Sequence, residues 1–197
     1  KLVEDEYAKK NLAGATEAGL PIGAYFFSQA LSMDEADQEI EYMLGILGDY
    51  RLDMPIILDW EIPASDARTA NMDARTLTDI QLYFCEKMKG LGYQPMVYFN
   101  WHQSENLYYL SELEDFPFWL ALYQDRMRYP WKVEMWQYTC TGRVPGINGD
   151  VDINAFQHYN YLENWNKENS ADLVSVADTY IAPIRLYSGT ENGKNKY

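Results

Sequence analysis

The feature that most constrains the fold is a regular alternation between short apolar runs and longer amphipathic segments. The apolar runs are IGAYFFS at 22–28, PIILDWE at 55–61 and QPMVYFN at 94–100. Amphipathic segments with helix start and stop signals lie at about 4–18, 32–47 and 73–92. Short apolar runs are typical of strands buried on both faces, and helical crossovers make such strands parallel. The pattern therefore predicts an α/β fold with a parallel sheet or barrel.

In the second half of the chain, strands no longer alternate with long helices. After a short helix at about 102–112, three further strands are expected at 116–123, 133–139 and 150–156, joined by short loops. This makes about six strands, two fewer than a closed β/α barrel needs. From the residues alone, a parallel sheet covered on both faces and a barrel that lacks two strands both remain open. Residues 161–197 are predicted to be a polar linker and C-terminal extension that forms one or two strands, such as a short hairpin.

Composition excludes several classes of function. The net charge of −14 and the lack of a basic stripe argue against nucleic acid, which requires clustered Lys and Arg. No apolar run is long enough to span a membrane, and the chain shows no signal peptide. With two Cys and two His, a zinc site or a nucleophilic triad is poorly supported, and two separate thiols are favoured over a disulfide. We expect no metal and no cofactor.

In the stretch PIILDWEIP, an apolar strand is followed directly by two carboxylates. Side chains at i and i+2 of a strand share a face, so Asp59 and Glu61 are predicted to project together. Their repulsion would raise the pKa of one of them, which keeps an acid protonated for general acid catalysis. Taken alone, the D-x-E pattern is explained as well by a polar strand end entering a solvated loop.

Polar and aromatic residues recur where the other strands end. The candidate set is Tyr25, Tyr98, Trp119, Tyr123, Gln137 and Asp152. Active sites of β/α barrels lie at the carboxyl ends of the strands. Carboxylates walled by Tyr and Trp suit a sugar site, because rings stack on sugar faces and acids protonate a glycosidic oxygen. For any single aromatic residue, core packing is an equally good explanation.

Five blocks together resemble a known family. They are AGLPIGAYFFSQA, PIILDWE, YQPMVYFN, FWLALY and MWQYTCTGRVPGINGDVDINAF, in order between about residues 7 and 156. The chain is similar here to the glycoside hydrolase family 25 lysozymes, the Chalaropsis-type N-acetylmuramidases of bacteria and phages. The resemblance implies an irregular TIM-like β/α barrel over residues 1–160, incomplete here because about six strands are expected instead of eight. It also implies cleavage of the β-1,4 bond between N-acetylmuramic acid and N-acetylglucosamine in peptidoglycan.

The same resemblance implies roles for individual residues. Glu61 matches the proton donor, and Asp59 matches the partner carboxylate that orients the substrate's acetamido group or stabilises the cationic intermediate. Asp152 falls on the acidic position of the VDIN block that lines the cleft. The residues that fall on groove positions are Tyr25, Tyr98, Trp119, Tyr123 and Gln137.

The sequence also departs from the family pattern. Family members begin with a strand carrying a further Asp and then a second strand, and this sequence matches only from the segment before the third. Phe26 stands where GxYHF usually has a histidine. A natural truncation, an artificial one, or self-association in which a neighbour covers the gap would each account for an incomplete barrel.

We therefore expect a peptidoglycan muramidase that acts extracellularly or at the cell wall, of bacterial or phage origin. Its expected partner is peptidoglycan, not nucleic acid or a membrane. A retaining mechanism assisted by the substrate's acetamido group is favoured, because no second nucleophile is obvious; a wide carboxyl separation would favour inversion. The alternative is a catalytically impaired peptidoglycan-binding module that lacks the first-strand Asp. A chitinase ranks low, because the D-x-x-D-x-D-x-E pattern is absent.

Overall fold

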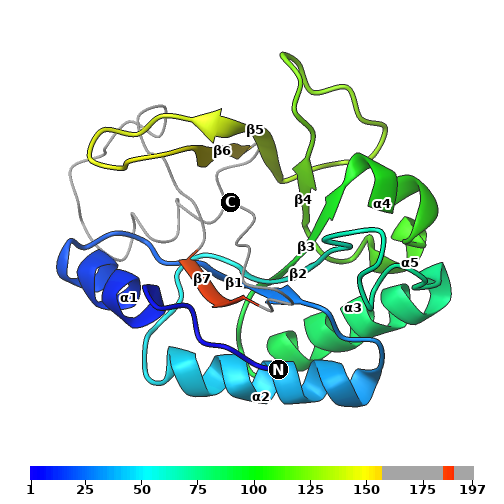
Figure 1. Ribbon diagram of the computed structural model, residues 1–197, viewed down its shortest axis with the longest axis horizontal. Helices are drawn as coiled ribbons and strands as arrows, with labels where there is room; N and C mark the ends of the chain where they lie inside the picture. The colour runs from blue at the N-terminus through cyan, green and yellow to red at the C-terminus, as the bar shows by residue number, and fades with distance from the viewer. Residues whose placement is uncertain (157–183, 189–197) are drawn as a thin grey trace.

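The computed structural model describes residues 1–156 and 184–188. Its centre is one sheet with the strand order β6-β5-β4-β3-β2-β1-β7 (Figure 1). The strands are β1 (Ala24–Ser28), β2 (Ile56–Trp60), β3 (Pro95–Asn100), β4 (Phe118–Ala121), β5 (Met135–Gly142), β6 (Val151–Phe156) and β7 (Ile184–Ser188). Because β6 and β7 end the order without pairing with each other, the sheet is open, which confirms the predicted incomplete β/α barrel.

Strand direction follows the connections. β1 to β5 pair in parallel with their neighbours, with Phe27 opposite Asp59 and Tyr98 opposite Trp119. β5 and β6 are antiparallel, because a short turn rather than a helix joins them. The carboxyl ends of β1 to β5 therefore meet along one edge of the sheet.

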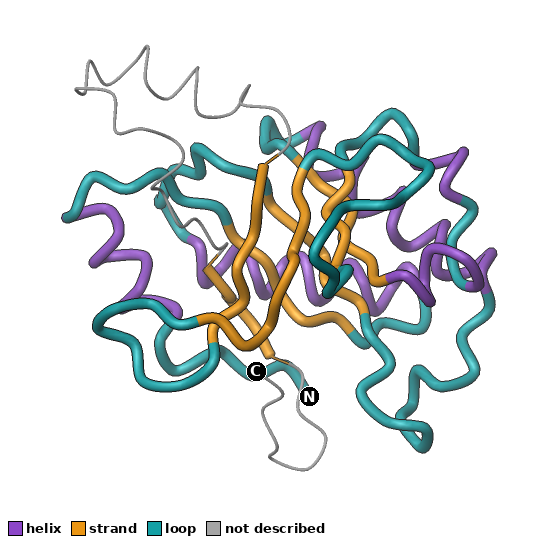
Figure 2. Tube along the Cα trace, turned by 90° about the horizontal axis from the view of Figure 1, so that it is seen from above, coloured by secondary structure: helices purple, strands orange, loops and turns teal. Residues whose placement is uncertain are grey.

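The helices connect the parallel strands and cover one face of the sheet (Figures 1 and 2). They are α1 (Ala8–Glu17), α2 (Met33–Leu47), α3 (Ala74–Gly90), α4 (Trp101–Asn106) and α5 (Leu110–Leu113). Ser32 caps α2 by accepting from the Glu35 N–H, and Asp73 caps α3 by accepting from the Thr76 N–H. The single helix expected at 102–112 is two, α4 and α5, with a break at Leu107–Tyr109.

The main hydrophobic core lies between the sheet and these helices. Alternate strand residues such as Phe26, Leu58 and Phe99 are fully buried there against helix residues such as Met43 and Phe84. A second cluster on the opposite, inner face consists of Ile57, Met96, Tyr98, Trp119, Ala121 and Met135. We call these two sides of the sheet the outer (helix-covered) face and the inner face.

The edge of β1 is covered. β7 pairs with it in parallel, placing Ala24 opposite Ile184 and Phe27 opposite Ser188. A paired edge no longer offers free backbone groups to another chain. β7 lies within the segment where one or two strands were expected; the remainder of that segment, including the rest of any hairpin, lies outside the described residues.

Candidate active site

β2 separates two kinds of side chain onto its two faces. Ile56, Leu58 and Trp60 belong to the outer core, whereas Ile57 belongs to the inner cluster. By the same alternation Asp59 projects to the inner face, and Glu61 follows directly after the strand. Asp59 is 9% exposed and Glu61 is half-buried. The tryptophan between the two carboxylates is therefore a core residue.

The backbone that carries the carboxylates is held from several directions. The Trp60 indole N–H donates to the carbonyl oxygen of Ala30 over 2.9 Å, which ties β2 to the loop after β1. The amide of Gln103, at the start of α4, donates to the carbonyl oxygen of Trp60. The Thr69 hydroxyl donates to the carbonyl oxygen of Glu61 over 3.1 Å. These bonds fix the position from which the Glu61 side chain projects.

Tyr98 links β3 to the carboxylates. Its hydroxyl donates to Oε1 of Glu61 over 3.2 Å, while its ring is 5% exposed. Burial, followed by the negative charges of Asp59 and Glu61, raises the pKa of Tyr98 well above its usual value. Tyr98 therefore remains a neutral hydrogen-bond donor toward Glu61 throughout the ordinary pH range.

Three aromatic rings form a wall on the inner face. The Trp119 ring lies 4.7 Å from the ring of Tyr98 and 6.1 Å from the ring of Tyr25, measured between centroids, in edge-to-face geometry. Its indole N–H donates to Oδ1 of Asn154 on β6 over 2.8 Å. The wall thus connects β1, β3, β4 and β6 beside the two carboxylates.

The remaining predicted residues lie toward β5 and β6. The Tyr123 hydroxyl donates to Oε1 of Gln137 over 2.8 Å. Burial is the main cause that raises the pKa of Tyr123, and the negative charge of Asp152 adds to it. Burial also raises the pKa of Asp152. Tyr123, Gln137 and Asp152 are therefore neighbours.

The structure brings the eight predicted site residues onto one side of the sheet. We call this group the inner cup: Tyr25, Asp59, Glu61, Tyr98, Trp119, Tyr123, Gln137 and Asp152. Chemically, it combines a half-buried carboxyl group, a second carboxylate two residues away and several rings. Among the described residues, no group of three His, Cys, Asp or Glu side chains is arranged to hold a metal ion.

Sequence reasoning missed two neighbours of the cup. Asn154 holds Trp119, and its place two residues after Asp152 on one strand was the signal that could have found it. Tyr108 is buried, and its pKa is raised by that burial and then by the charge of Asp59. No sequence pattern points to Tyr108, because α4, α5 and their connection place it there.

Two other expectations concern residues outside the cup. Phe26, which departs from the family's usual histidine, lies in the outer core with its ring 5.7 Å from that of Phe84. Cys85 and Cys140 are free thiols, as expected. Within the described part of the chain, no helix has the length and apolar character needed to cross a membrane.

Comparison with known families identifies the family of the chain. The model of glycosyl hydrolases family 25 matches residues 1–147. The chain belongs to this family. The structure of a bacterial lysozyme from Streptomyces coelicolor has the same fold, with a TM-score of 0.62 over 85% of this chain and 81% of that one, at 22% sequence identity.

Two further relatives extend the comparison. The modular autolysin LytC from Streptococcus pneumoniae is 25% identical, with a TM-score of 0.67 over 77% of this chain and 37% of that chain. The Escherichia coli K12 protein YegX is 30% identical over 165 residues, which are 79% of this chain and 55% of YegX. The chain thus spans about half the length of YegX.

The end of the chain matches a different model. Residues 147–196 match the NlpA lipoprotein family. Outer membrane lipoprotein 3 of Mannheimia haemolytica is 50% identical over 40 residues, which are 20% of this chain and 15% of that protein. The two family matches meet at residue 147, between β5 and β6, although these strands form one antiparallel pair.

Proposed function

We propose that this member of glycosyl hydrolases family 25 is a muramidase, which hydrolyses the β-1,4 bond between N-acetylmuramic acid and N-acetylglucosamine in peptidoglycan. The proposal depends mainly on the position and the contacts of Glu61. It follows β2 at the carboxyl edge of the sheet, next to Asp59, and its carboxyl group meets the Tyr98 hydroxyl. A solved LytC structure holds a synthetic peptidoglycan ligand, which supports the same class of substrate.

In the proposed reaction, Glu61 is the general acid. Its proton goes to the glycosidic oxygen as the bond from that oxygen to C1 of N-acetylmuramic acid breaks, and the 4-hydroxyl of N-acetylglucosamine leaves. The Glu61 carboxylate then takes a proton from the water that attacks C1. The product is a reducing N-acetylmuramic acid end.

Asp59 supports the charge that develops on the sugar. We assign it the role of orienting the substrate's acetamido group, which attacks C1 and is displaced by water, so that configuration is retained. Asp59 is suited to this because it projects to the same face as Glu61 from a rigid, fully buried strand. The rings of Tyr25, Tyr98 and Trp119 would receive apolar sugar faces.

The remaining expectations stay proposals. Tyr123, Gln137 and Asp152 are assigned to substrate binding on the β5–β6 side of the cup. The enzyme would act on peptidoglycan outside the cell or at the wall, where a net charge of −14 disfavours contact with anionic polymers. Residues 1–160 would form the catalytic unit, with residues 161–197 as an extension that contributes β7 to the sheet.

The deciding experiment is a digest of purified peptidoglycan with the 197-residue chain and with Glu61→Gln. Muropeptides that end in reducing N-acetylmuramic acid should appear with the unsubstituted chain. Because general acid catalysis contributes roughly 10²–10⁴-fold, the variant should lose activity by about that factor. Glu86→Gln, at an exposed position of α3, is the matched control and should keep full activity.

Mass spectrometry of the products separates the possible outcomes. Reducing N-acetylglucosamine ends would assign a different bond specificity. Full activity in Glu61→Gln would refute the assignment of the acid. Retention of the chain on insoluble peptidoglycan without any released reducing end would identify a binding module instead of an enzyme.

A further inference from the structure

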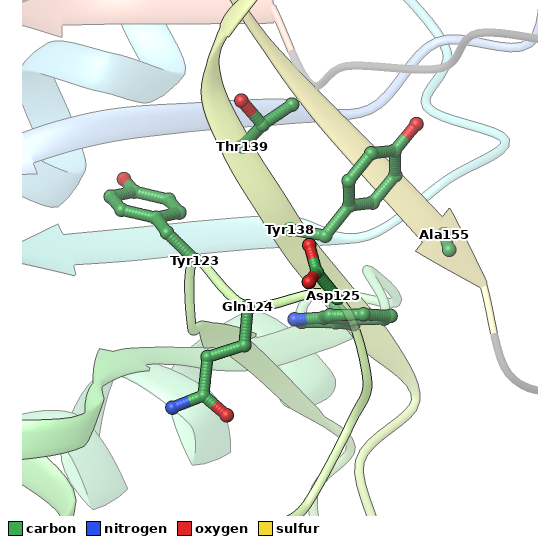
Figure 3. Close-up of a pocket in the computed structure, with 7 residues that line it drawn as sticks. Tyr123, Gln124, Asp125, Tyr138, Thr139 and Ala155 are labelled. Atoms are coloured by element: carbon green, nitrogen blue, oxygen red, sulfur yellow. The ribbon is translucent and has the colours of Figure 1, made fainter.

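A hollow lies next to the inner cup, beside β5 and β6. It has a volume of about 640 Å³ and is lined by Tyr123, Gln124, Asp125, Trp136, Tyr138, Thr139 and Ala155. Figure 3 shows Tyr123 and Tyr138 on either side of it, with Asp125 between them. We call it the outer groove, because Trp136 belongs to the outer core whereas its neighbours Met135 and Gln137 lie on the inner side.

Two rings of β5 build one wall of the outer groove. Trp136 and Tyr138 lie at i and i+2 of the strand, so alternation points both side chains to the same face. The Tyr138 ring consequently lies 5.5 Å from the ring of Trp136, and both rings line the same space.

A hydrogen bond from the indole N–H holds the Trp136 ring in place. Its indole N–H donates to the carbonyl oxygen of Leu122 over 2.7 Å, in the segment that follows β4. The hydrogen-bonding edge is therefore used within the protein, and what the ring offers the groove is an apolar surface. Trp136 and Tyr138 are both half-buried, so part of each ring remains accessible.

The polar residues of the lining indicate which net charge a ligand of the groove can carry. Gln124 and Asp125 are exposed side chains at the mouth of the groove, and the lining residues include no Lys, Arg or His. Among the described residues that line the groove, Asp125 is the one charged residue, and its carboxylate repels anions. The lining thus fits a neutral molecule with an apolar face and hydroxyl groups at its edge, which describes a pyranose sugar.

Tyr123 connects the outer groove to the inner cup. Its ring, which is 55% exposed, lines the groove, while its hydroxyl donates to Gln137 within the cup. A chain of linked sugars lying in the cup could thus continue over Tyr123 into the groove. We propose that the outer groove is an accessory subsite for a neutral N-acetylhexosamine unit of the same glycan strand.

This proposal rests on the proposed glycan substrate, so its test must read the two sites separately. The indole N–H signals of Trp119 and Trp136 report on the cup and on the groove, respectively. The full chain carrying Glu61→Gln, which prevents cleavage, is titrated with the tetramer of N-acetylglucosamine while both signals are followed by ¹⁵N–¹H NMR. We expect both signals to shift and to saturate.

Variants then assign the groove. Because one tetramer is proposed to span the cup and the groove, Tyr138→Ala should weaken the affinity roughly fivefold at both signals, since one stacking ring is lost. Trp131→Ala removes an exposed ring of the same β4–β5 loop that does not line the groove, and should change neither titration. Asp125→Asn, at an exposed position, keeps the test available if Tyr138→Ala fails to fold; it should weaken binding at Trp136 severalfold.

The outcomes separate the two proposals. The accessory subsite is overturned if the Trp136 signal does not shift. It is also overturned if the affinity is the same with and without Tyr138→Ala or Asp125→Asn. A shift at Trp136 without one at Trp119 upholds the groove as a sugar site but counts against the cup. A shift at Trp119 alone leaves the proposed function standing and removes the subsite.

Discussion

The outer and inner faces of the sheet differ in what their side chains do. On the outer face, Phe26, Leu58 and Trp60 are fully buried in the core that the sheet forms with the helices, and their main contribution is dense packing. On the inner face, the corresponding strands present Tyr98, Trp119 and two carboxylates. Because side chains alternate along a strand, one short sequence such as IILDWE serves stability and chemistry with neighbouring residues.

One residue of the outer side breaks this division. Glu39 of α2 is 6% exposed, and its Oε1 accepts from the backbone N–H of Gln29 over 3.3 Å. Burial raises the pKa of Glu39 to about 7, against the opposing effect of its hydrogen bonds to Ser28 and Gln29. A carboxyl group among core residues thus lies directly behind the loop that receives the Trp60 indole N–H at Ala30.

The largest effect on folding is expected from Trp60→Ala. Truncating a fully buried tryptophan removes its packing and leaves a cavity, which costs about 3–5 kcal/mol of unfolding free energy. It also removes the bond to Ala30. Urea denaturation should show this loss. Trp101→Ala, at a 39% exposed position, is the control and should change the unfolding free energy far less. Equal losses in the two variants would contradict the division between the faces.

A smaller, pH-dependent effect is expected from Glu39→Gln. The pKa of Glu39 is about 7 in the folded chain, against 4.5 as the reference value. Between these values the folded state keeps a proton that the unfolded state releases, so the unfolding free energy falls as pH rises through this window. The loss amounts to about 3 kcal/mol by pH 8.

Glutamine cannot ionise, so Glu39→Gln should escape that loss. Urea unfolding of both proteins at pH 5 and pH 8 is the measurement, and the variant should gain stability relative to the unsubstituted chain at pH 8. Glu41→Gln, at an exposed position of the same helix, should follow the unsubstituted chain at both pH values. Parallel pH profiles for all three proteins would show that Glu39 does not titrate in this window.

The smallest effect is expected on the inner face, from Tyr98→Phe. The ring and its contact with Trp119 remain, while the hydroxyl that donates to Glu61 is lost. We expect peptidoglycan hydrolysis to slow about fivefold, equivalent to roughly 1 kcal/mol, with little change in unfolding free energy. Tyr7→Phe, at a 54% exposed position, is the control for the substitution itself. A stability loss as large as that of Trp60→Ala would show that Tyr98 acts through packing.

Much of the fold could be predicted because its signals are local. Apolar runs bounded by Gly, Pro and capping residues located β1, β2 and β3, and Ser32 marked the start of α2. The break between α4 and α5 was less predictable, because the Tyr109 N–H at the start of α5 donates to the Thr78 hydroxyl of α3 over 3.0 Å, a contact between residues far apart in the sequence. The pairing of β7 with β1 joins residues far apart in the chain, and no local pattern encodes it.

The sequence by itself determined the alternation of strands and helices, the two carboxylates at i and i+2, and the rings at the strand ends, because periodicity and capping act over a few residues. Only the tertiary structure decided that Trp60 packs outward, that the Tyr98 hydroxyl meets Glu61, and that Asn154 holds Trp119. It also decided that Tyr123, which follows β4, lines the same hollow as Trp136 and Tyr138 of β5. These contacts depend on strand order and register, which are set by the long-range packing of the whole sheet.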